Sequence, residues 1–195
     1  MEKLLLSEIA HCLNAECPEE KVITEISTDT RNLPAGCLFI AIKGERFDGH
    51  AFIKQAIENG AAAAVSEYPV DGCPCIVVKN TRTALLKLAK YYRSKFNPVL
   101  VGITGSVGKT TTKEMIALVL SEKYKTLKTQ GNLNNEIGLP KTLFNLDSSY
   151  QAAVIEMGMS DFGEIERLSN TAVPTIGVIT VSYTHLRAHE TDSYL

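Results

Sequence analysis

The stretch GITGSVGKTTTKE, residues 102–114, follows the apolar run PVLV and decides how the second half of the chain folds. A short apolar run before a glycine-rich loop predicts a buried strand, and the loop is followed by a helical pattern. Gly105 and Gly108 allow bends that let successive backbone N–H groups converge on phosphate oxygens at a helix N-terminus. Lys109 and Thr110 supply the ammonium and hydroxyl groups that such loops use for the β/γ-phosphates and Mg²⁺. The stretch therefore predicts a nucleotide site.

The glycine spacing departs from the usual phosphate-binding pattern by one place. The standard pattern puts a glycine five residues before Gly108, where this chain has Ile103, and the glycine stands instead at Gly102. The alternative is a glycine-rich turn between strand and helix that carries Lys-Thr by chance. The strand–loop–helix context favours the nucleotide site, and we call residues 105–111 the phosphate loop.

The rest of the second half alternates strand and helix patterns. Strands are expected at KTLKTQ, AAVIEMG and TIGVIT, a broken helix at NEIGLPKTLFNL and a helix at GEIERLSN. Strands that alternate with helices of this length imply right-handed crossovers and a parallel sheet. Lys113, one turn beyond Lys109, is expected to face solvent.

The first half predicts a smaller α/β unit. Short strands are expected at ISTDTR, CLFIAIKG, AAAAVSE and CIVVKN, and helices at HAFIKQAIENG and TRTALLKLAKYYRSKF. The two halves meet near Asn97-Pro98. We therefore expect a domain over residues 1–97 and a second, incomplete parallel-sheet domain over residues 98–180.

Composition excludes several classes of protein. The 195 residues are 45% hydrophobic with a formal net charge of −2 and no basic stripe, so nucleic acid is not an expected partner. No apolar run reaches the ~18 residues needed to span a bilayer, and the N-terminus is unlike a secretory signal. Five cysteines without a regular framework indicate reduced thiols and a cytoplasmic protein. The Cys-Pro-Cys at residues 73–75 lacks zinc-site spacing.

Two further polar features follow predicted strands. Glu156 closes the strand AAVIE, and the carboxyl ends of parallel strands are where such sheets bind ligands. A carboxylate there could hold Mg²⁺ opposite Thr110. Asn132, Asn134 and Asn135 lie within four residues and could offer amides to a ligand. Their alternative role is an asparagine-rich turn that caps the next helix.

These pieces together resemble the Mur ligase family, the ATP-dependent amino-acid ligases of peptidoglycan precursor synthesis. The resemblance covers about residues 20–180 and rests on GITGSVGKTTT with its displaced glycine, and on STDTR, GCLFIAIKGERFDGHAFI and ENGAAAAV. Two stretches, TQGNLNNEIGLPKTLF and VIEMGMSDFGEI, are closest to the member that adds D-alanyl-D-alanine to UDP-N-acetylmuramoyl-tripeptide. The first half would then be a UDP-muramoyl-peptide-binding domain and the second an ATP-binding domain.

The resemblance implies roles for named residues. The ATP phosphates would contact Gly105, Ser106, Val107, Gly108, Lys109, Thr110 and Thr111, with Asn134 and Asn135 beside the nucleotide. Mg²⁺ would be held by Thr110 and Glu156, and the implied catalytic residues are Lys109 and Glu156. The uridine end of the substrate would contact Thr28, Asp29, Thr30, Arg31, Glu45, Arg46, Phe47, Asp48, Gly49 and His50. A lone histidine before AFI is also typical of a helix-start residue with a satisfied ring, and for His50 both readings stay open.

The implied reaction begins with attack of the peptide carboxylate on the γ-phosphorus of ATP, which gives an acyl phosphate and ADP. The dipeptide amine then attacks the activated carbonyl, and phosphate leaves. Two anions approach one another in the first step, so cations are needed mainly to stabilise charge. The implied partners are therefore ATP, Mg²⁺, UDP-N-acetylmuramoyl-tripeptide and D-alanyl-D-alanine, acting on a monomer.

The last residues depart from the family pattern. After TIGVIT the chain reads VSYTHLRAHETDSYL, and we expect residues 181–195 to be a non-native tail. His185 and His189 stand at i and i+4, which could chelate a metal on a helix, but no role is assigned to them. Family members are considerably longer than this chain, so we expect the chain alone to be inactive and to leave a sheet edge exposed.

Two other functions are compatible with the same patterns. One is related chemistry on another substrate, by the ligase that adds the third amino acid or by a folate polyglutamate synthetase; the UDP-sugar pattern disfavours the folate enzyme. The other is a non-enzymatic module that uses ATP as a switch, which should distinguish ADP from ATP and bind no UDP-sugar.

Overall fold

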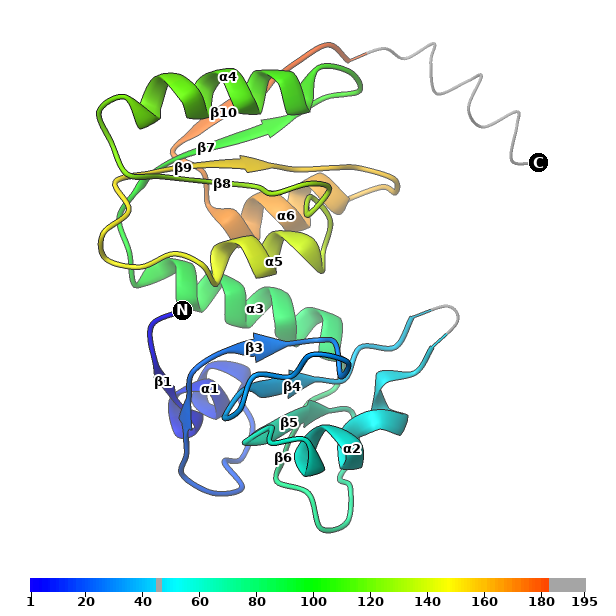
Figure 1. Ribbon diagram of the computed structural model, residues 1–195. Helices are drawn as coiled ribbons and strands as arrows, with labels where there is room; N and C mark the ends of the chain where they lie inside the picture. The colour runs from blue at the N-terminus through cyan, green and yellow to red at the C-terminus, as the bar shows by residue number, and fades with distance from the viewer. Residues whose placement is uncertain (45–46, 183–195) are drawn as a thin grey trace, which may run out of the picture.

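The computed structural model describes residues 1–44 and 47–182. Glu45 and Arg46, two predicted substrate contacts, lie outside the described residues, as do His185, His189 and most of the predicted non-native tail. Figure 1 shows the described chain as two α/β layers joined through helix α3. Within the described residues, no helix combines the length and the apolar character needed to cross a membrane.

The first half contains a four-stranded parallel sheet of order β3-β4-β5-β6 and a small antiparallel pair, β1-β2. Its elements are β1 (Leu4–Leu5), α1 (Leu6–Leu13), β2 (Val22–Ile23), β3 (Ile26–Ser27), β4 (Leu38–Ile40), the 3₁₀ helix η1 (Gly49–Phe52), α2 (Ile53–Glu58), β5 (Ala63–Ser66), β6 (Cys75–Val77) and α3 (Thr81–Ser94). The four predicted strands and two predicted helices are present. The helix α1 and the β1-β2 pair were not predicted.

The second half contains a parallel sheet of order β10-β7-β9-β8. Its elements are β7 (Val99–Thr104), α4 (Lys109–Ser121), β8 (Thr126–Lys128), α5 (Gly138–Leu143), β9 (Ala152–Glu156), α6 (Glu164–Ala172) and β10 (Ile176–Ile179). Helix α4 covers one face of this sheet, and α5 and α6 cover the other (Figure 1). This arrangement confirms the predicted parallel α/β architecture and puts the phosphate loop between β7, a central strand, and α4.

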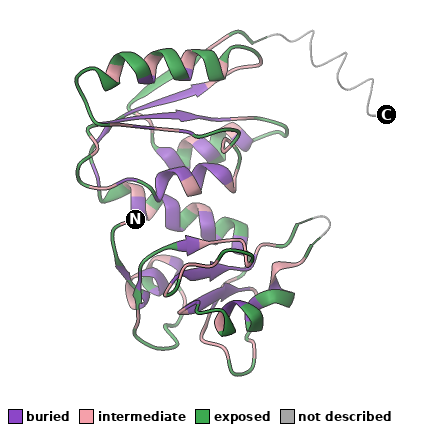
Figure 2. Cartoon of the chain, viewed as in Figure 1, coloured by how far each residue is buried: buried purple, intermediate pink, exposed green. Residues whose placement is uncertain are grey.

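Helix α3 packs against both halves. It begins at Thr81 because Asn80 caps it, accepting a hydrogen bond from the Thr83 backbone N–H at 2.8 Å. Its buried side includes Leu85, Leu88 and Tyr92, which are part of one apolar core that extends from α1 to α6. Figure 2 shows the inner sides of the helices and the central strands β4, β5, β7 and β9 buried, whereas much of the outer side of α4 is exposed. The shared core fixes the phosphate loop relative to the first half.

Candidate functional site

The phosphate loop has a backbone that requires glycine at two positions. Gly105 has φ of +140° and Gly108 has φ of +87°, conformations that other residues rarely adopt. Space also matters at Gly105, where an added Cβ would lie 2.1 Å from the Thr180 hydroxyl oxygen. That hydroxyl lies 2.8 Å from the Val107 carbonyl oxygen and 3.1 Å from that of Thr104. The end of β10 therefore holds the loop in shape.

The amides of the phosphate loop differ in what they face. The Ser106 and Val107 N–H groups donate to the Val181 carbonyl at 2.8 and 3.3 Å. These two predicted phosphate contacts thus have backbone partners within the chain. Lys109, Thr110 and Thr111 form the first turn of α4, and first-turn N–H groups of a helix lack intrahelical partners. The helix N-terminus is consequently the part of the loop best suited to phosphate oxygens.

Lys109 lies against the loop that precedes it. Its ammonium donates to the Gly105 carbonyl at 2.7 Å and lies 3.4 Å from the Ser106 carbonyl oxygen. A half-buried ammonium at the N-terminus of α4 adds positive charge where the helix dipole already favours anions. This is the position that the sequence predicted for a phosphate-binding lysine.

Glu156 is the centre of a polar cluster at the carboxyl end of β9. Its side chain is buried, with the residue 2% exposed, and Oε2 accepts a hydrogen bond from the Thr110 hydroxyl at 3.0 Å. Oε1 accepts one from the Asn134 amide at 2.9 Å, and the backbone N–H donates to the Thr129 hydroxyl at 2.9 Å. Three of the residues singled out from the sequence, Thr110, Asn134 and Glu156, therefore meet directly. Thr129 was not predicted, because a lone threonine after a short strand carries no distinctive signal.

Lys113 belongs to the same cluster, which corrects the expectation that it faces solvent. It is 2% exposed, with its ammonium 3.1 Å from Glu114 Oε1 and 3.8 Å from Glu156 Oε2. The physical reason is helical spacing: residues four apart share a face, so Lys113 follows Lys109 on the side of α4 that meets the sheet. Near-continuous polarity in this part of α4 hid that face from the sequence pattern.

The asparagine-rich stretch divides between the two predicted roles. Asn134 reaches the carboxylate of Glu156, as a site residue would. Asn135 instead accepts hydrogen bonds from the backbone N–H groups of Ile137 and Gly138 at 3.1 and 2.8 Å, at the start of α5. Asn135 is therefore a capping residue in this structure, as the alternative reading of the stretch proposed. Its nucleotide contact stays a prediction.

The oxygen donors at the end of β9 fit Mg²⁺. The Thr110 hydroxyl and the Glu156 carboxylate are hard oxygen ligands 3.0 Å apart, beside the phosphate loop. Mg²⁺ is usually bound by one or two protein ligands together with substrate phosphates and water. In the described part of the chain no group of three or more His, Cys, Asp or Glu residues is placed to hold a metal. The cluster therefore fits a metal that is shared with a bound nucleotide.

The predicted uridine contacts after β3 form a turn at the surface of the first half. Arg31 pairs with Asp29 at 2.5 Å, and hydrogen bonds from the Arg31 side chain and backbone hold the Asp29 pKa well below its usual range. The Ser27 hydroxyl accepts from the Asp29 N–H at 3.1 Å. Thr28 and Thr30 belong to the same turn and are half-buried, whereas Arg31 is exposed. The turn lies at the carboxyl end of a parallel strand, where such sheets bind ligands.

The second group of predicted uridine contacts surrounds η1. Phe47 is 74% exposed, and Asp48 caps η1 by accepting from the His50 N–H at 3.0 Å. Hydrogen bonds from the His50 backbone and ring lower the Asp48 pKa. Gly49 approaches the chain closely, because an added Cβ would lie 2.8 Å from backbone atoms of Ile42. Phe47 and Asp48 are thus accessible to a ligand, whereas Gly49 has a packing role.

His50 has the structural role that was one of its two predicted readings. Its ring is buried, Nδ1 lies 2.6 Å from Asp48 Oδ1, and Nε2 accepts from the Glu67 N–H at 3.0 Å. Because Nε2 is an acceptor, Nδ1 carries the proton and donates to Asp48. The ring also stacks on Tyr68 with centroids 4.9 Å apart. Both ring nitrogens are therefore already engaged within the chain.

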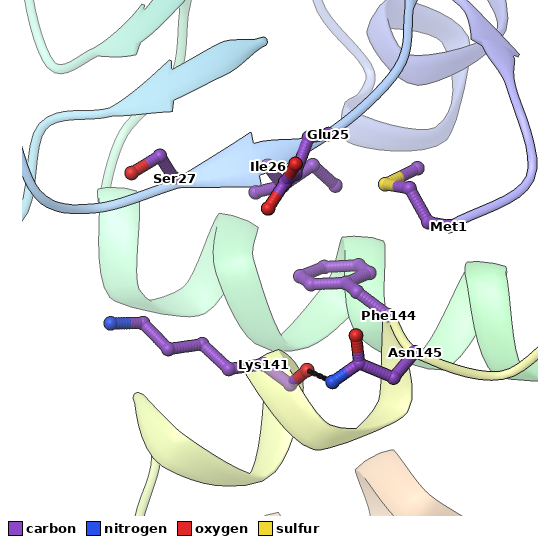
Figure 3. A pocket seen from close by; sticks show the side chains of 7 residues that line it. All are labelled: Met1, Glu25, Ile26, Ser27, Lys141, Phe144 and Asn145. Atoms are coloured by element: carbon purple, nitrogen blue, oxygen red, sulfur yellow. Dashed lines mark hydrogen bonds between the residues drawn. The ribbon is translucent and has the colours of Figure 1, made fainter. Parts of the chain in front are cut away.

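A pocket of about 240 Å³ lies between the N-terminal sheet and α5. Figure 3 shows Lys141 of α5 and Asn145, two residues after that helix, opposite Glu25 and Ser27 of the segment around β3. Ser27 is the residue immediately before the Thr28–Arg31 turn. The pocket therefore lies between the residue that precedes this turn and α5, the helix that follows Asn134.

Comparisons with known proteins agree with these features. Residues 22–93 match the Mur ligase family catalytic domain, and residues 103–193 match the Mur ligase middle domain. The UDP-N-acetylmuramoyl-tripeptide–D-alanyl-D-alanine ligase of Synechocystis sp. is 48% identical over 166 residues, covering 83% of this chain and 37% of that relative. The structure of the UDP-N-acetylmuramoylalanyl-D-glutamyl-2,6-diaminopimelate–D-alanyl-D-alanyl ligase from Acinetobacter baumannii has a TM-score of 0.87 at 37% identity, covering 92% of this chain and 42% of that one.

A second solved structure contains a nucleotide. The MurF ligase from Thermotoga maritima in complex with ADP has a TM-score of 0.75 at 37% identity, covering 80% of this chain and 37% of that one. In each of these comparisons the chain spans about two fifths of the length of the protein that it matches.

Proposed function

The chain belongs to the Mur ligase family, and on that premise we propose that it supplies the UDP-sugar-binding and ATP-binding regions of a ligase. The proposed reaction joins D-alanyl-D-alanine to UDP-N-acetylmuramoyl-tripeptide in peptidoglycan precursor synthesis. The names of the Synechocystis and Acinetobacter relatives support this choice of substrates. The solved ADP complex of a relative supports ATP as the nucleotide.

One observation carries the proposal: Thr110 and Asn134 converge on the buried Glu156 carboxylate beside the phosphate loop. A glycine-rich turn with a chance Lys-Thr gives no reason for a buried carboxylate at that position. Burying a carboxylate is costly even where a lysine such as Lys113 offsets its charge, so its presence calls for a function. A metal-assisted nucleotide site gives it one.

The residues have distinct tasks in the proposed reaction. Lys109 and the α4 N-terminus bind the phosphates and stabilise the charge that builds up as the substrate carboxylate approaches the γ-phosphorus. Thr110 and Glu156 would hold Mg²⁺, which neutralises phosphate charge when it is bound. Asn134 fixes the orientation of the Glu156 carboxylate through its 2.9 Å hydrogen bond.

The first half would bind the UDP-sugar end of the substrate. The Thr28–Arg31 turn, Phe47 and Asp48 offer hydrogen-bonding groups and an exposed aromatic ring. The pocket between Ser27 and Lys141 lies beside this turn and would hold the peptide end of the substrate (Figure 3). We also propose a cytoplasmic monomer, in keeping with the five free cysteines.

A binding titration tests the function. The chain is titrated with UDP-N-acetylmuramoyl-tripeptide, with the dipeptide form as control, and with Mg-ATP in a separate experiment. Binding that UDP competes and that prefers the tripeptide is the expected result. A folded chain that binds Mg-ATP but no UDP-sugar would overturn the ligase proposal and favour the nucleotide switch. A preference for the dipeptide form would favour the ligase that adds the third amino acid.

A further inference from the structure

Lys113 is a buried cation that the reaction described above does not use. We propose that Lys113 is a positioning residue for Glu156: its ammonium balances the carboxylate when nucleotide is absent, so that a divalent cation binds firmly only together with nucleotide phosphates. This inference rests on the proposed nucleotide and metal site. It adds a residue that controls when the metal binds.

Burial makes a cation beside Glu156 necessary. Lys113 and Glu156 are each 2% exposed, and their charged atoms lie 3.8 Å apart. The Thr110 and Asn134 groups that bond to the carboxylate are neutral. Among the contacts of Glu156 in the described part of the chain, the Lys113 ammonium is the one that carries charge. An ionised carboxylate at such a site is strongly disfavoured without a paired cation.

The position of Lys113 is fixed from its other side. Its ammonium lies 3.1 Å from Glu114 Oε1, and the other Glu114 oxygen pairs with Lys128 on β8. Charges thus alternate from Lys128 through Glu114 and Lys113 to Glu156. A side chain held between two carboxylates has little freedom to leave when another cation approaches.

Lys113 and a metal would act on the same oxygen. The Glu156 oxygen nearest to Lys113, Oε2, is also the one that bonds to Thr110, the other proposed metal ligand. Two cations near one carboxylate repel each other, and the repulsion is strong where water is excluded. Nucleotide phosphates at the phosphate loop bring negative charge that offsets this repulsion. The metal is therefore expected to bind with the nucleotide and weakly by itself.

The test is Mn²⁺ binding to the full chain, measured by electron paramagnetic resonance with and without ADP. In the unsubstituted chain we expect Mn²⁺ to bind at least about tenfold more tightly when ADP is present. Lys113→Met, which keeps the length of the side chain and removes its charge, should strengthen binding of Mn²⁺ alone by about tenfold or more. Lys113→Arg should restore the weak binding, since it restores the charge.

Matched controls separate this role from a general effect of charge or folding. Lys128→Met removes a lysine from the same row of charges without touching Glu156, and should change Mn²⁺ affinity by less than about twofold because exposed charges are screened. Unchanged or weaker binding of free Mn²⁺ by a folded Lys113→Met chain would overturn the proposal. If that variant does not fold, equal Mn²⁺ affinity of the unsubstituted chain with and without ADP would overturn it as well. Failure of the chain to bind Mn-ADP at all would count instead against the proposed nucleotide site.

Discussion

At the scale of single residues, Lys109 is the side chain from which the nucleotide site can be tested most directly. Lys109→Ala removes a cation that lies against the phosphate loop, with its ammonium 2.7 Å from the Gly105 carbonyl oxygen. We expect nucleotide binding to weaken by ~1.5–3 kcal/mol, the range for hydrogen bonds to charged groups. Isothermal titration with Mg-ATP measures the change.

The control for Lys109→Ala is Lys123→Ala, an exposed lysine just after the end of α4. It removes the same charge at the other end of α4 and should leave ATP affinity nearly unchanged. Equal ATP affinity in the Lys109→Ala chain and the unsubstituted chain would remove Lys109 from the site.

Gly105 tests the shape of the phosphate loop. A Cβ at this position would lie 2.1 Å from the Thr180 hydroxyl oxygen, and φ of +140° is itself unfavourable for alanine. Gly105→Ala should therefore displace the loop and weaken ATP binding. The backbone strain alone should cost about 1–3 kcal/mol when alanine adopts the φ of Gly105. Gly72→Ala is the matched control, since Gly72 also has positive φ but no atom within 4 Å of the added Cβ. A Gly105→Ala chain that binds ATP like the Gly72→Ala chain would contradict the role assigned to Thr180.

A site residue could be predicted where its role follows from its place at the end of a strand or in a loop, and could not where its role depends on packing between distant segments. Glu156 and Thr110 follow from local rules, because a parallel sheet places strand ends and loops at one edge. The burial of Lys113 could not be predicted in this way, since it depends on how α4 lies on a sheet whose strands are distant in sequence. His50 stayed ambiguous because its ring partner Glu67 is 17 residues away. Contacts of that kind are set by packing and leave no short-range pattern.

At the scale of elements, Tyr92 connects α3 to two other segments. Its hydroxyl donates to the Leu146 carbonyl at 2.7 Å and accepts from the Glu2 N–H at 2.7 Å. Tyr92→Phe keeps the ring, which packs edge-on against Phe144. It removes the hydrogen-bond partner of the Leu146 carbonyl and of the Glu2 N–H. We expect a loss of about 1–3 kcal/mol in the free energy of unfolding, measured with urea.

An exposed tyrosine provides the comparison for Tyr92→Phe. Tyr124, beyond the end of α4, is 37% exposed, and Tyr124→Phe should change stability by less than about 0.5 kcal/mol. If the two substitutions cost the same, the buried hydroxyl of Tyr92 does not stabilise the chain.

Glu8 connects α1 to α3 and should make stability depend on pH. Burial acts to raise the Glu8 pKa, but hydrogen bonds from Lys95 and Tyr91 outweigh burial, and the folded pKa is lowered. A lowered pKa stabilises the fold above the unfolded pKa and ceases to do so as the pH falls through the folded value. The melting temperature should therefore fall between about pH 6 and about pH 3, and less steeply in Glu8→Gln. Glu16→Gln, at an exposed position after α1, should retain the slope of the unsubstituted chain.

The elements that were not predicted share a physical cause. Helix α1 has only eight residues, and its cap at Leu5 lacks a side-chain hydrogen bond, so the usual start signal is missing. The strands β1 and β2 have two residues each and exist through pairing with one another. By contrast, the longer alternating elements of the second half carry their own periodicity, and the predicted parallel sheet was confirmed.

At the scale of the whole molecule, the two predicted domains share one apolar core. That core includes Leu38 of the first sheet, Leu88 of α3 and Leu143 of α5 in a single cluster. The two sheets lie on either side of Asn97-Pro98, but the apolar core is continuous across that point. The domain boundary there therefore remains a prediction. Sequence patterns mark where elements change, whereas a shared core forms only when distant segments pack.

A shared core predicts that the two halves unfold together. Urea unfolding should show one transition, and Mg-ADP should stabilise both halves although it binds the second. At a concentration of 100 times Kd, the ligand should add about 2.7 kcal/mol to the free energy of unfolding. Hydrogen exchange would then show amides of β5 and of β9 slowed by similar factors, since both would exchange through the same global opening.

Lys109→Ala supplies the control for that experiment, because it should remove the effect of Mg-ADP from both strands at once. Slower exchange confined to β9, or two separate urea transitions, would show that the halves unfold independently. In that case nucleotide binding would not stabilise the part of the first half that holds the uridine contacts around Asp29. If both strands respond, occupancy of the phosphate loop also stabilises the sheet that presents those contacts. The first half would then be most ordered when nucleotide is bound.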